Sequence, residues 1–277
     1  MITSLARVVD LLRCPRCHAS FSWDERALCC GQGHTFDIAR QGYVNLTGAA
    51  QPAHADTAPM VAARSELLDS GRYAAVVDAL ITTLPTDVPE ILDVGTGTGH
   101  YAAAALQARP GARSLGLDVS VAACRRAARA HPRLAVVTAD VWVRLPVVDA
   151  GVDVVLSVFS PRNVEEFARV LRPHGCVITV TPGPDHLDEL RSTFGLLGVE
   201  SDKERRLTDT FGRAGLSTSQ QWRVEVHDPW TADDAIRSIM MGPNAFHSRS
   251  AEIRAAAGRL SWPRPVTVSC VITRWTR

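Results

Sequence analysis

The chain has 277 residues, of which 46% are hydrophobic and 21% charged, so it can bury one full-sized core and still carry a small accessory domain. No run approaches the roughly 18 consecutive apolar residues of a membrane span, and a charge interrupts the apolar N-terminal segment, which argues against a signal peptide. We therefore expect a cytoplasmic protein with no membrane partner. The net charge of +1 neither supports nor excludes an RNA partner, because a local basic face is sufficient to bind phosphates.

The seven cysteines, an odd number without a secretion signal, favour free thiols or metal ligands over a disulfide framework. Near the N-terminus, the pattern C-x2-C-x12-C-x3-H supplies two close pairs of ligand types, as in a closed, structural zinc site. The predicted ligands are Cys14, Cys17, Cys30 and His34. Cys29 is an alternative third ligand, but Cys30 is favoured because Gly31 and Gly33 follow it and suit a tight turn.

Residues 14–50 are rich in Cys and Gly and lack long periodic patterns, so we expect residues 1–50 to form a small zinc-binding module that recognises RNA and whose fold depends on the metal. A redox role for the C-x-x-C pair would need a neighbouring strand–helix unit, and none surrounds it in the sequence. The remaining cysteines lie in apolar patterns and are predicted to be core residues: Cys124, Cys176 and Cys270.

Residues 51–58 resemble a linker, and from there to residue 277 we expect one α/β domain. Residues 60–84 place apolar side chains at helical spacing, with Gly71 between two helices. Five apolar runs rich in β-branched residues then alternate with helical stretches such as 100–109 and 121–131, which predicts a parallel, doubly wound sheet. The predicted strands are 90–95, 114–119, 134–141, 153–159 and 175–182, and further strands are expected around 219–226 and 265–275.

The first of these strands leads into a glycine loop that reads D-x-G-x-G-x-G, at the edge where strand ends form a crevice. Its residues are Asp93, Gly95, Gly97 and Gly99. A dinucleotide site would prefer G-x-G-x-x-G, so this spacing favours S-adenosylmethionine and a Rossmann-like, class I methyltransferase domain. Asp118 ends the next strand, where it can accept both ribose hydroxyls, and Asp140 with the Val141 amide can meet the adenine. Taken singly, either acid could instead be a strand-end or helix-capping carboxylate.

Several segments together resemble one family. They are the zinc pattern, residues 34–46, residues 60–73, the glycine loop, VFSPRN at 158–163 and TPGPDHL at 181–187. This combination resembles the RlmA-type 23S rRNA guanine-N1 methyltransferases over nearly the whole chain. The resemblance implies methyl transfer to N1 of a guanine in hairpin 35, by a homodimer whose zinc modules help to grip the RNA. It also implies the same four zinc ligands and adenosylmethionine contacts from four residues: Tyr73, Gly97, Thr98 and His186.

VFSPRN and the Ala- and Arg-rich composition are similar to the branch found in Gram-positive bacteria and macrolide-producing actinomycetes. In some producers such enzymes confer resistance to tylosin- or mycinamicin-type macrolides, which makes resistance a second expectation. Ser160 stands where a close relative of that branch would have Ala. This departure leaves the class unchanged but leaves open which base is the target.

The residue that removes the guanine N1 proton is not evident from the sequence. Loss of this proton needs either a base or stabilisation of the charge that develops on O6, and the candidates beside the fourth and fifth strand ends are Asn163, Arg162 and Asp185. Asn163 can orient a base edge but cannot act as an ordinary base, whereas Asp185 could accept the proton or simply cap the next helix. Phe159 and Trp142 could stack on an extruded base, or pack in the core. Two rival functions remain: a methyltransferase of small molecules, and an RNA-binding protein that keeps the fold without catalysis.

Overall fold

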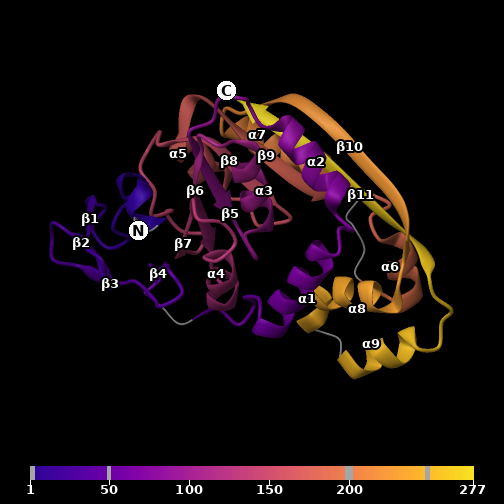
Figure 1. Ribbon diagram of the computed structural model, residues 1–277. Helices are drawn as coiled ribbons and strands as arrows, with labels where there is room; N and C mark the ends of the chain where they lie inside the picture. The colour runs from indigo at the N-terminus through magenta and orange to yellow at the C-terminus, as the bar shows by residue number, and fades with distance from the viewer. Residues whose placement is uncertain (1–3, 49–50, 197–201, 247–249) are drawn as a thin grey trace.

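The computed structural model describes residues 4–48, 51–196, 202–246 and 250–277. An eight-stranded sheet runs through the molecule in the order β10-β11-β9-β8-β5-β6-β7-β4, and a separate three-stranded sheet lies at the N-terminal end (Figure 1). The strands of the large sheet are β4 (Tyr43–Asn45), β5 (Glu90–Val94), β6 (Arg113–Asp118), β7 (Leu134–Thr138), β8 (Val152–Val158), β9 (Leu171–Pro182), β10 (Ser217–Trp230) and β11 (Arg264–Thr276). All of these strands except β4 occupy predicted segments, and β5 to β9 run parallel as predicted.

Both ends of the sheet differ from a simple parallel arrangement. The C-terminal strands β10 and β11 enter antiparallel to each other and to β9. At the other edge, β4 pairs in parallel with β7, with Tyr43 opposite Val136. The side chain of Asn45 accepts a hydrogen bond from Thr138 Oγ1 at 2.6 Å, which fixes this added strand. The last strand of the predicted N-terminal module thus belongs to the large sheet, and the predicted domain boundary at 50 falls on residues 49–50, outside the described ranges.

Helices cover both faces of the sheet. They are α1 (Ala58–Asp69), α2 (Ala74–Thr83), α3 (His100–Ala108), α4 (Val121–Ala127), α5 (Val164–Val170), α6 (Asp188–Phe194), α7 (Lys203–Arg213), α8 (Ala232–Met240) and α9 (Ser250–Ala257). The core on one face contains residues from α1 to α4 and α6, and the core on the other contains residues from α5, α7 and the N-terminal segment. Gly71, with φ of +81°, separates α1 from α2 as predicted. No helix in the described ranges is long and apolar enough to span a bilayer.

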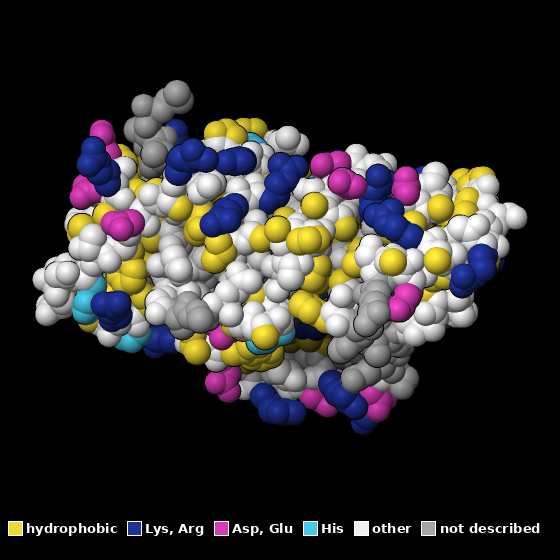
Figure 2. All heavy atoms as spheres, turned by 90° about the horizontal axis from the view of Figure 1, so that it is seen from below, with side chains coloured by type: hydrophobic (Ala, Val, Ile, Leu, Met, Phe, Trp, Pro, Cys, Tyr) yellow, Lys and Arg dark blue, Asp and Glu magenta, His cyan; other side chains and the backbone are white. Residues whose placement is uncertain are grey.

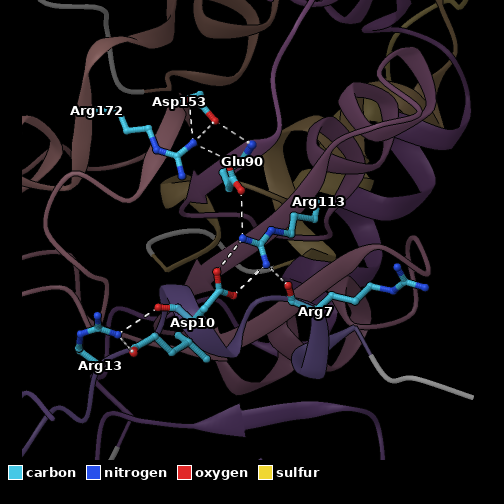
Figure 3. Close-up of polar contacts among 8 residues, drawn as sticks. Arg7, Asp10, Arg13, Glu90, Arg113, Asp153 and Arg172 are labelled. Atoms are coloured by element: carbon cyan, nitrogen blue, oxygen red, sulfur yellow. Dashed lines mark hydrogen bonds and ion pairs between the residues drawn. The ribbon is translucent and has the colours of Figure 1, made fainter. Parts of the chain in front are cut away.

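The N-terminal segment is anchored to the sheet by two short turns of 3-10 helix, η1 (Leu5–Arg7) and η2 (Val9–Leu11). Figure 3 shows an ion-pair network beneath it, in which Arg113 lies between Asp10 at 2.7 Å and Glu90 at 3.0 Å. Arg172 extends the network to Asp153 at 2.8 Å. These residues lie near the amino ends of β5, β6, β8 and β9, away from the carboxyl edge where the glycine loop begins. The network joins the N-terminal segment to the large sheet.

Candidate functional site

The four predicted zinc ligands come together around the small sheet formed by β1 (Phe21–Trp23), β2 (Ala27–Cys30) and β3 (Thr35–Asp37). Their ligand atoms all lie within 4.8 Å of one another. Cys17 Sγ is 3.6 Å from Cys30 Sγ, and His34 Nδ1 is 3.5 Å from Cys14 Sγ and 3.4 Å from Cys30 Sγ. A zinc tetrahedron with usual bond lengths has edges of about 3.8 Å between sulfurs and about 3.6 Å between sulfur and nitrogen. The donor set therefore fits Zn²⁺ in size and chemistry.

The electrostatics and the strand register both favour Cys30 over Cys29 as the third ligand. Burial raises the pKa of the Cys30 thiol, but backbone amides of Gln32 and His34 and the neighbouring thiols outweigh it and lower the pKa to about 6. Thiolate is the form that binds zinc. Cys29 Sγ instead contacts Thr35 Oγ1 at 3.7 Å, since successive side chains of a strand point to opposite faces.

The glycine loop connects β5 to α3 at the carboxyl edge of the sheet, and its three glycines have left-handed backbone conformations. Their φ angles are +73° at Gly95, +56° at Gly97 and +78° at Gly99, which L side chains rarely adopt. A Cβ at Gly95 would lie 2.4 Å from Ser160 Cβ, so the loop packs directly against the end of β8. The Gly97 amide donates to Asp118 Oδ2 at 2.9 Å, which joins the loop to the end of β6.

Two buried carboxylates flank this loop. Burial raises the pKa of Asp93 to about 7, the Thr96 hydroxyl opposes that rise, and the nearby Asp118 adds to it. Thr96 Oγ1 donates to Asp93 Oδ2 at 2.6 Å. Burial also raises the pKa of Asp118, although the amides of Ser120 and Gly97 partly oppose it. Both acids keep acceptor capacity beyond these hydrogen bonds, and the cationic groups and ribose hydroxyls of adenosylmethionine match that capacity. This donor set therefore fits the cofactor.

The predicted adenine-facing residues lie at the end of β7. Asp140 Oδ1 accepts a hydrogen bond from the Trp142 amide at 2.9 Å, and the Val141 carbonyl accepts one from Asn163 Nδ2 at 3.0 Å. Trp142 itself is 61% exposed. Thr98 is buried within the glycine loop. The sites predicted from the glycine loop and from the strand ends thus share one edge of the sheet.

An aromatic cluster lines the same edge. Tyr73, at the start of α2, lies with its hydroxyl 3.4 Å from His186 Nε2, and the Phe159 ring stacks near His186 at 6.0 Å. Tyr101 contributes a further ring, 6.4 Å from Phe159. Phe159 has a φ of +52° and is 39% exposed, an unusual conformation for a bulky residue. The resemblance to the family implied cofactor contacts for Tyr73 and His186, and the structure places them together.

The three residues considered for the loss of the guanine N1 proton have different environments. Asn163 caps α5, because its side chain accepts from the Glu166 amide at 3.4 Å while its Nδ2 donates to the β7 loop. Asp185 is exposed, and α6 has no side-chain cap. Arg162 is half-buried without an ion-pair partner in the described part of the chain, and burial lowers its pKa.

Ser160 has a packing role at the end of β8. Its hydroxyl donates to the Val94 carbonyl at 2.7 Å and lies 3.0 Å from Ser157 Oγ. An alanine here would lose these hydrogen bonds but keep the Cβ that contacts Gly95. Ser160, where a close relative would have alanine, therefore affects how the glycine loop packs against the end of β8.

Two residues of this region were not singled out in the sequence. Arg64 of α1 lies over Gly97, and Tyr101 of α3 joins the aromatic cluster. Arg64 sits in the 60–73 segment that resembles the family, which was the available signal for it. Tyr101 follows the glycine loop by two residues, a position from which a helix side chain can face the crevice.

Comparison with known proteins agrees with this geometry. The profile of the RlmA N-terminal zinc ribbon matches residues 12–51, and that of a methyltransferase domain matches residues 91–175. The chain is 42% identical over 271 residues to the 23S rRNA (guanine(748)-N1)-methyltransferase of Streptomyces fradiae, with 96% of each chain covered. A protein of Micromonospora griseorubida that carries the name of a 23S rRNA (guanine-N1)-methyltransferase is also 42% identical, over 95% of this chain and 96% of that one.

Among solved structures, a chain of the complex between the Haloferax volcanii Trm112 activator and a methyltransferase superposes with a TM-score of 0.51. It is 20% identical and covers 78% of this chain and 93% of its own, so the likeness concerns the fold alone. Fold, glycine loop and acidic strand ends define a class I, adenosylmethionine-dependent methyltransferase that carries a zinc ribbon. More particularly, the chain belongs to the RlmA-type family of 23S rRNA (guanine-N1)-methyltransferases.

Proposed function

We propose that this protein transfers a methyl group from S-adenosylmethionine to N1 of a guanine in the hairpin 35 region of 23S rRNA. The observation that carries the proposal is the combination, in one chain, of a Cys₃His ribbon with the acid-flanked glycine loop. A relative that shares 42% identity over 96% of both chains acts on guanine 748 of 23S rRNA by its name. An enzyme with this substrate works where ribosomal RNA is found, in the cytoplasm.

The predicted site residues at the carboxyl edge of the sheet would position the cofactor. Asp118, already oriented by the Gly97 and Ser120 amides, would accept the two ribose hydroxyls. Asp140 and the Val141 amide would meet the adenine. Tyr73, Thr98 and His186, with the glycine loop, would hold the methionine moiety and the sulfonium. The bound cofactor supplies an electrophilic methyl group, and the protein's work is to bring guanine N1 onto the axis of that methyl group and to exclude water.

The guanine must leave its stack to reach this edge. Phe159 and Trp142, both exposed, would stack on the extruded base or its neighbour, a sequence-tolerant contact. On the face seen from below, separate basic side chains lie among apolar and acidic ones (Figure 2), and basic side chains are the groups that neutralise RNA phosphates.

Guanine N1 carries a proton that has to leave before or during methyl transfer. Of the three candidates, Asp185 is exposed and can accept a proton, whereas Asn163 orients the β7 and β8 loops through its capping contacts. Arg162 can stabilise negative charge on guanine O6, which would favour loss of the N1 proton.

We extend the proposal to a homodimer in which both ribbons contact RNA, and to a role in macrolide resistance.

The test is transfer of labelled methyl from adenosylmethionine to 23S rRNA that lacks its own modifications, followed by primer extension across hairpin 35. A new stop at a guanine, absent with Asp118→Ala, supports the proposal and identifies the base. Labelled RNA without that stop would mean that the methylated base lies outside hairpin 35. Label that appears only in a metabolite extract would favour the small-molecule rival, and an absence of label together with RNA binding would favour the non-catalytic one.

A further inference from the structure

Arg64 is placed at the cofactor loop by α1, which crosses the carboxyl edge of the sheet. A Cβ on Gly97 would come within 3.4 Å of Arg64 Nη1 and within 3.8 Å of its Cδ. The Arg64 side chain is 24% exposed, so its charge is partly withdrawn from water. Among the described residues, this guanidinium is the cationic group in contact range of the loop's central glycine.

The guanidinium still has donors to offer. Its Nη1 is paired with Asp56 and its Nη2 donates to the Met241 carbonyl at 2.7 Å. These contacts use two of the five N–H groups of an arginine, and the structure gives the others no partner within its described residues. Asp56 precedes α1 and Met241 follows α8, so two separate segments of the chain hold the guanidinium.

The surroundings are rich in negative charge and poor in positive charge. Asp56, Asp93 and Asp118 all lie around the loop, and Asp56 and Arg64 act on the ionisation of Asp118 in opposite directions. Ser120 Oγ donates to the Asp56 carbonyl at 2.6 Å, which places the segment before α1 against the end of β6. An anionic ligand group entering this acidic crevice needs a cation, and Arg64 is positioned to provide it.

We propose that Arg64 binds the α-carboxylate of the cofactor's methionine moiety. A planar fork with free donors matches a carboxylate, which can accept two parallel hydrogen bonds. The loop beneath it is the part of the site that approaches the amino-acid end, because Asp118 and Asp140 occupy the ribose and adenine ends. The inference rests on the adenosylmethionine half of the proposed function and not on its RNA substrate.

The test is equilibrium binding by isothermal titration calorimetry, without RNA, of two probes. S-adenosylhomocysteine carries the carboxylate, and its decarboxylated analogue keeps the amino group but lacks the carboxylate. We expect the unaltered protein to bind the first about tenfold to hundredfold more tightly, the range of a charge-assisted pair. Arg64→Gln should abolish most of that preference by weakening the first probe alone, and Arg64→Lys should restore part of it.

Arg126→Gln is the matched control, because Arg126 also contacts α1, through Ser65 Oγ at 2.8 Å, but this contact is exposed to solvent. It should keep the preference unchanged. Equal weakening of both probes by Arg64→Gln would overturn the proposal and leave Arg64 a structural clamp between Asp56 and Met241. An unaltered protein without a preference would also overturn it, whether or not the variants fold. If neither probe binds the unaltered protein, both the Arg64 proposal and the proposed function are refuted. If the unaltered protein shows the preference but does not methylate RNA, only the proposed RNA substrate is refuted and the Arg64 assignment stands.

Discussion

The strands of the zinc ribbon have three or four residues each, whereas the parallel strands that carry the cofactor loop have five to twelve. The ribbon strands bury a few apolar side chains, among them Phe21, Leu28 and Phe36, in the core that also covers one face of the large sheet. The ribbon's ligand cluster joins the segment before β1 to the end of β2 and the turn that follows. In the cofactor region the buried strands supply the stability, and the glycine loop can adopt three left-handed residues at their ends. We therefore expect the ribbon to depend on its metal for stability, whereas the long buried strands hold a loop whose left-handed residues are glycines.

The largest expected effect comes from removing the metal ligands. Cys14→Ser with Cys17→Ser should abolish zinc binding and unfold β1 to β3, because structural zinc contributes about 10–16 kcal/mol to the folding of such modules. The sheet should remain, so that S-adenosylhomocysteine binds within about threefold of its original affinity. Zinc content and hydrogen exchange measure the two parts. Cys29→Ser is the control, and retention of stoichiometric zinc by the double variant would refute the ligand assignment.

The reverse experiment alters the cofactor crevice and spares the ribbon. Asp118→Ala should weaken S-adenosylhomocysteine binding by about 30- to 150-fold, since it removes charge-assisted hydrogen bonds to two ribose hydroxyls. Zinc content should stay at one ion per chain. Asp78→Ala, which removes an exposed carboxylate on α2, should leave binding unchanged. An Asp118→Ala variant with unaltered affinity would move the ribose site away from β6.

Replacing a glycine by alanine should also cost more stability in the cofactor loop than in the zinc ribbon. Gly95→Ala combines a φ of +73° with a Cβ placed 2.4 Å from Ser160, and we expect a loss of about 2–4 kcal/mol in the free energy of unfolding. Gly33→Ala has a similar φ of +80° but nothing within 4 Å of its Cβ, so about 1 kcal/mol is expected. Denaturant unfolding of zinc-loaded protein measures both. Equal losses would show that the contact with β8 contributes nothing.

The differences between the two regions also explain which features of the fold and the site could be predicted from the sequence. The five parallel strands were predictable because buried strands have continuous apolar runs, and the metal pattern and the glycine loop were predictable because their chemistry restricts residue type and spacing. The strand β4 was missed because three residues carry no periodicity, and it is defined by pairing with β7 far along the chain. Arg64 over Gly97 was missed for the same reason, since a single arginine in a helix carries no sign of what the fold places beneath it.

The smallest expected effect is a pH dependence of the cofactor crevice. Burial raises the pKa of Asp93 to about 7, so below that pH the carboxyl is protonated and cannot pair with the cofactor's ammonium group. The sign follows: in the free protein this group lowers stability as pH rises toward 7, while ligand affinity increases over the same interval and levels off above it. S-adenosylhomocysteine should bind several-fold more weakly at pH 6 than at pH 8.

Histidines also titrate in this interval, and His186 lies in the same crevice, so the informative quantity is the difference between two proteins. Asp93→Asn should bind more weakly at pH 8 and approach the unaltered protein at pH 6, because an amide resembles the protonated acid. The affinity profiles of the two proteins would then converge on acidification. Parallel profiles would assign the pH dependence to histidine, and would indicate that Asp93 supports the loop through Thr96 without pairing with the ligand.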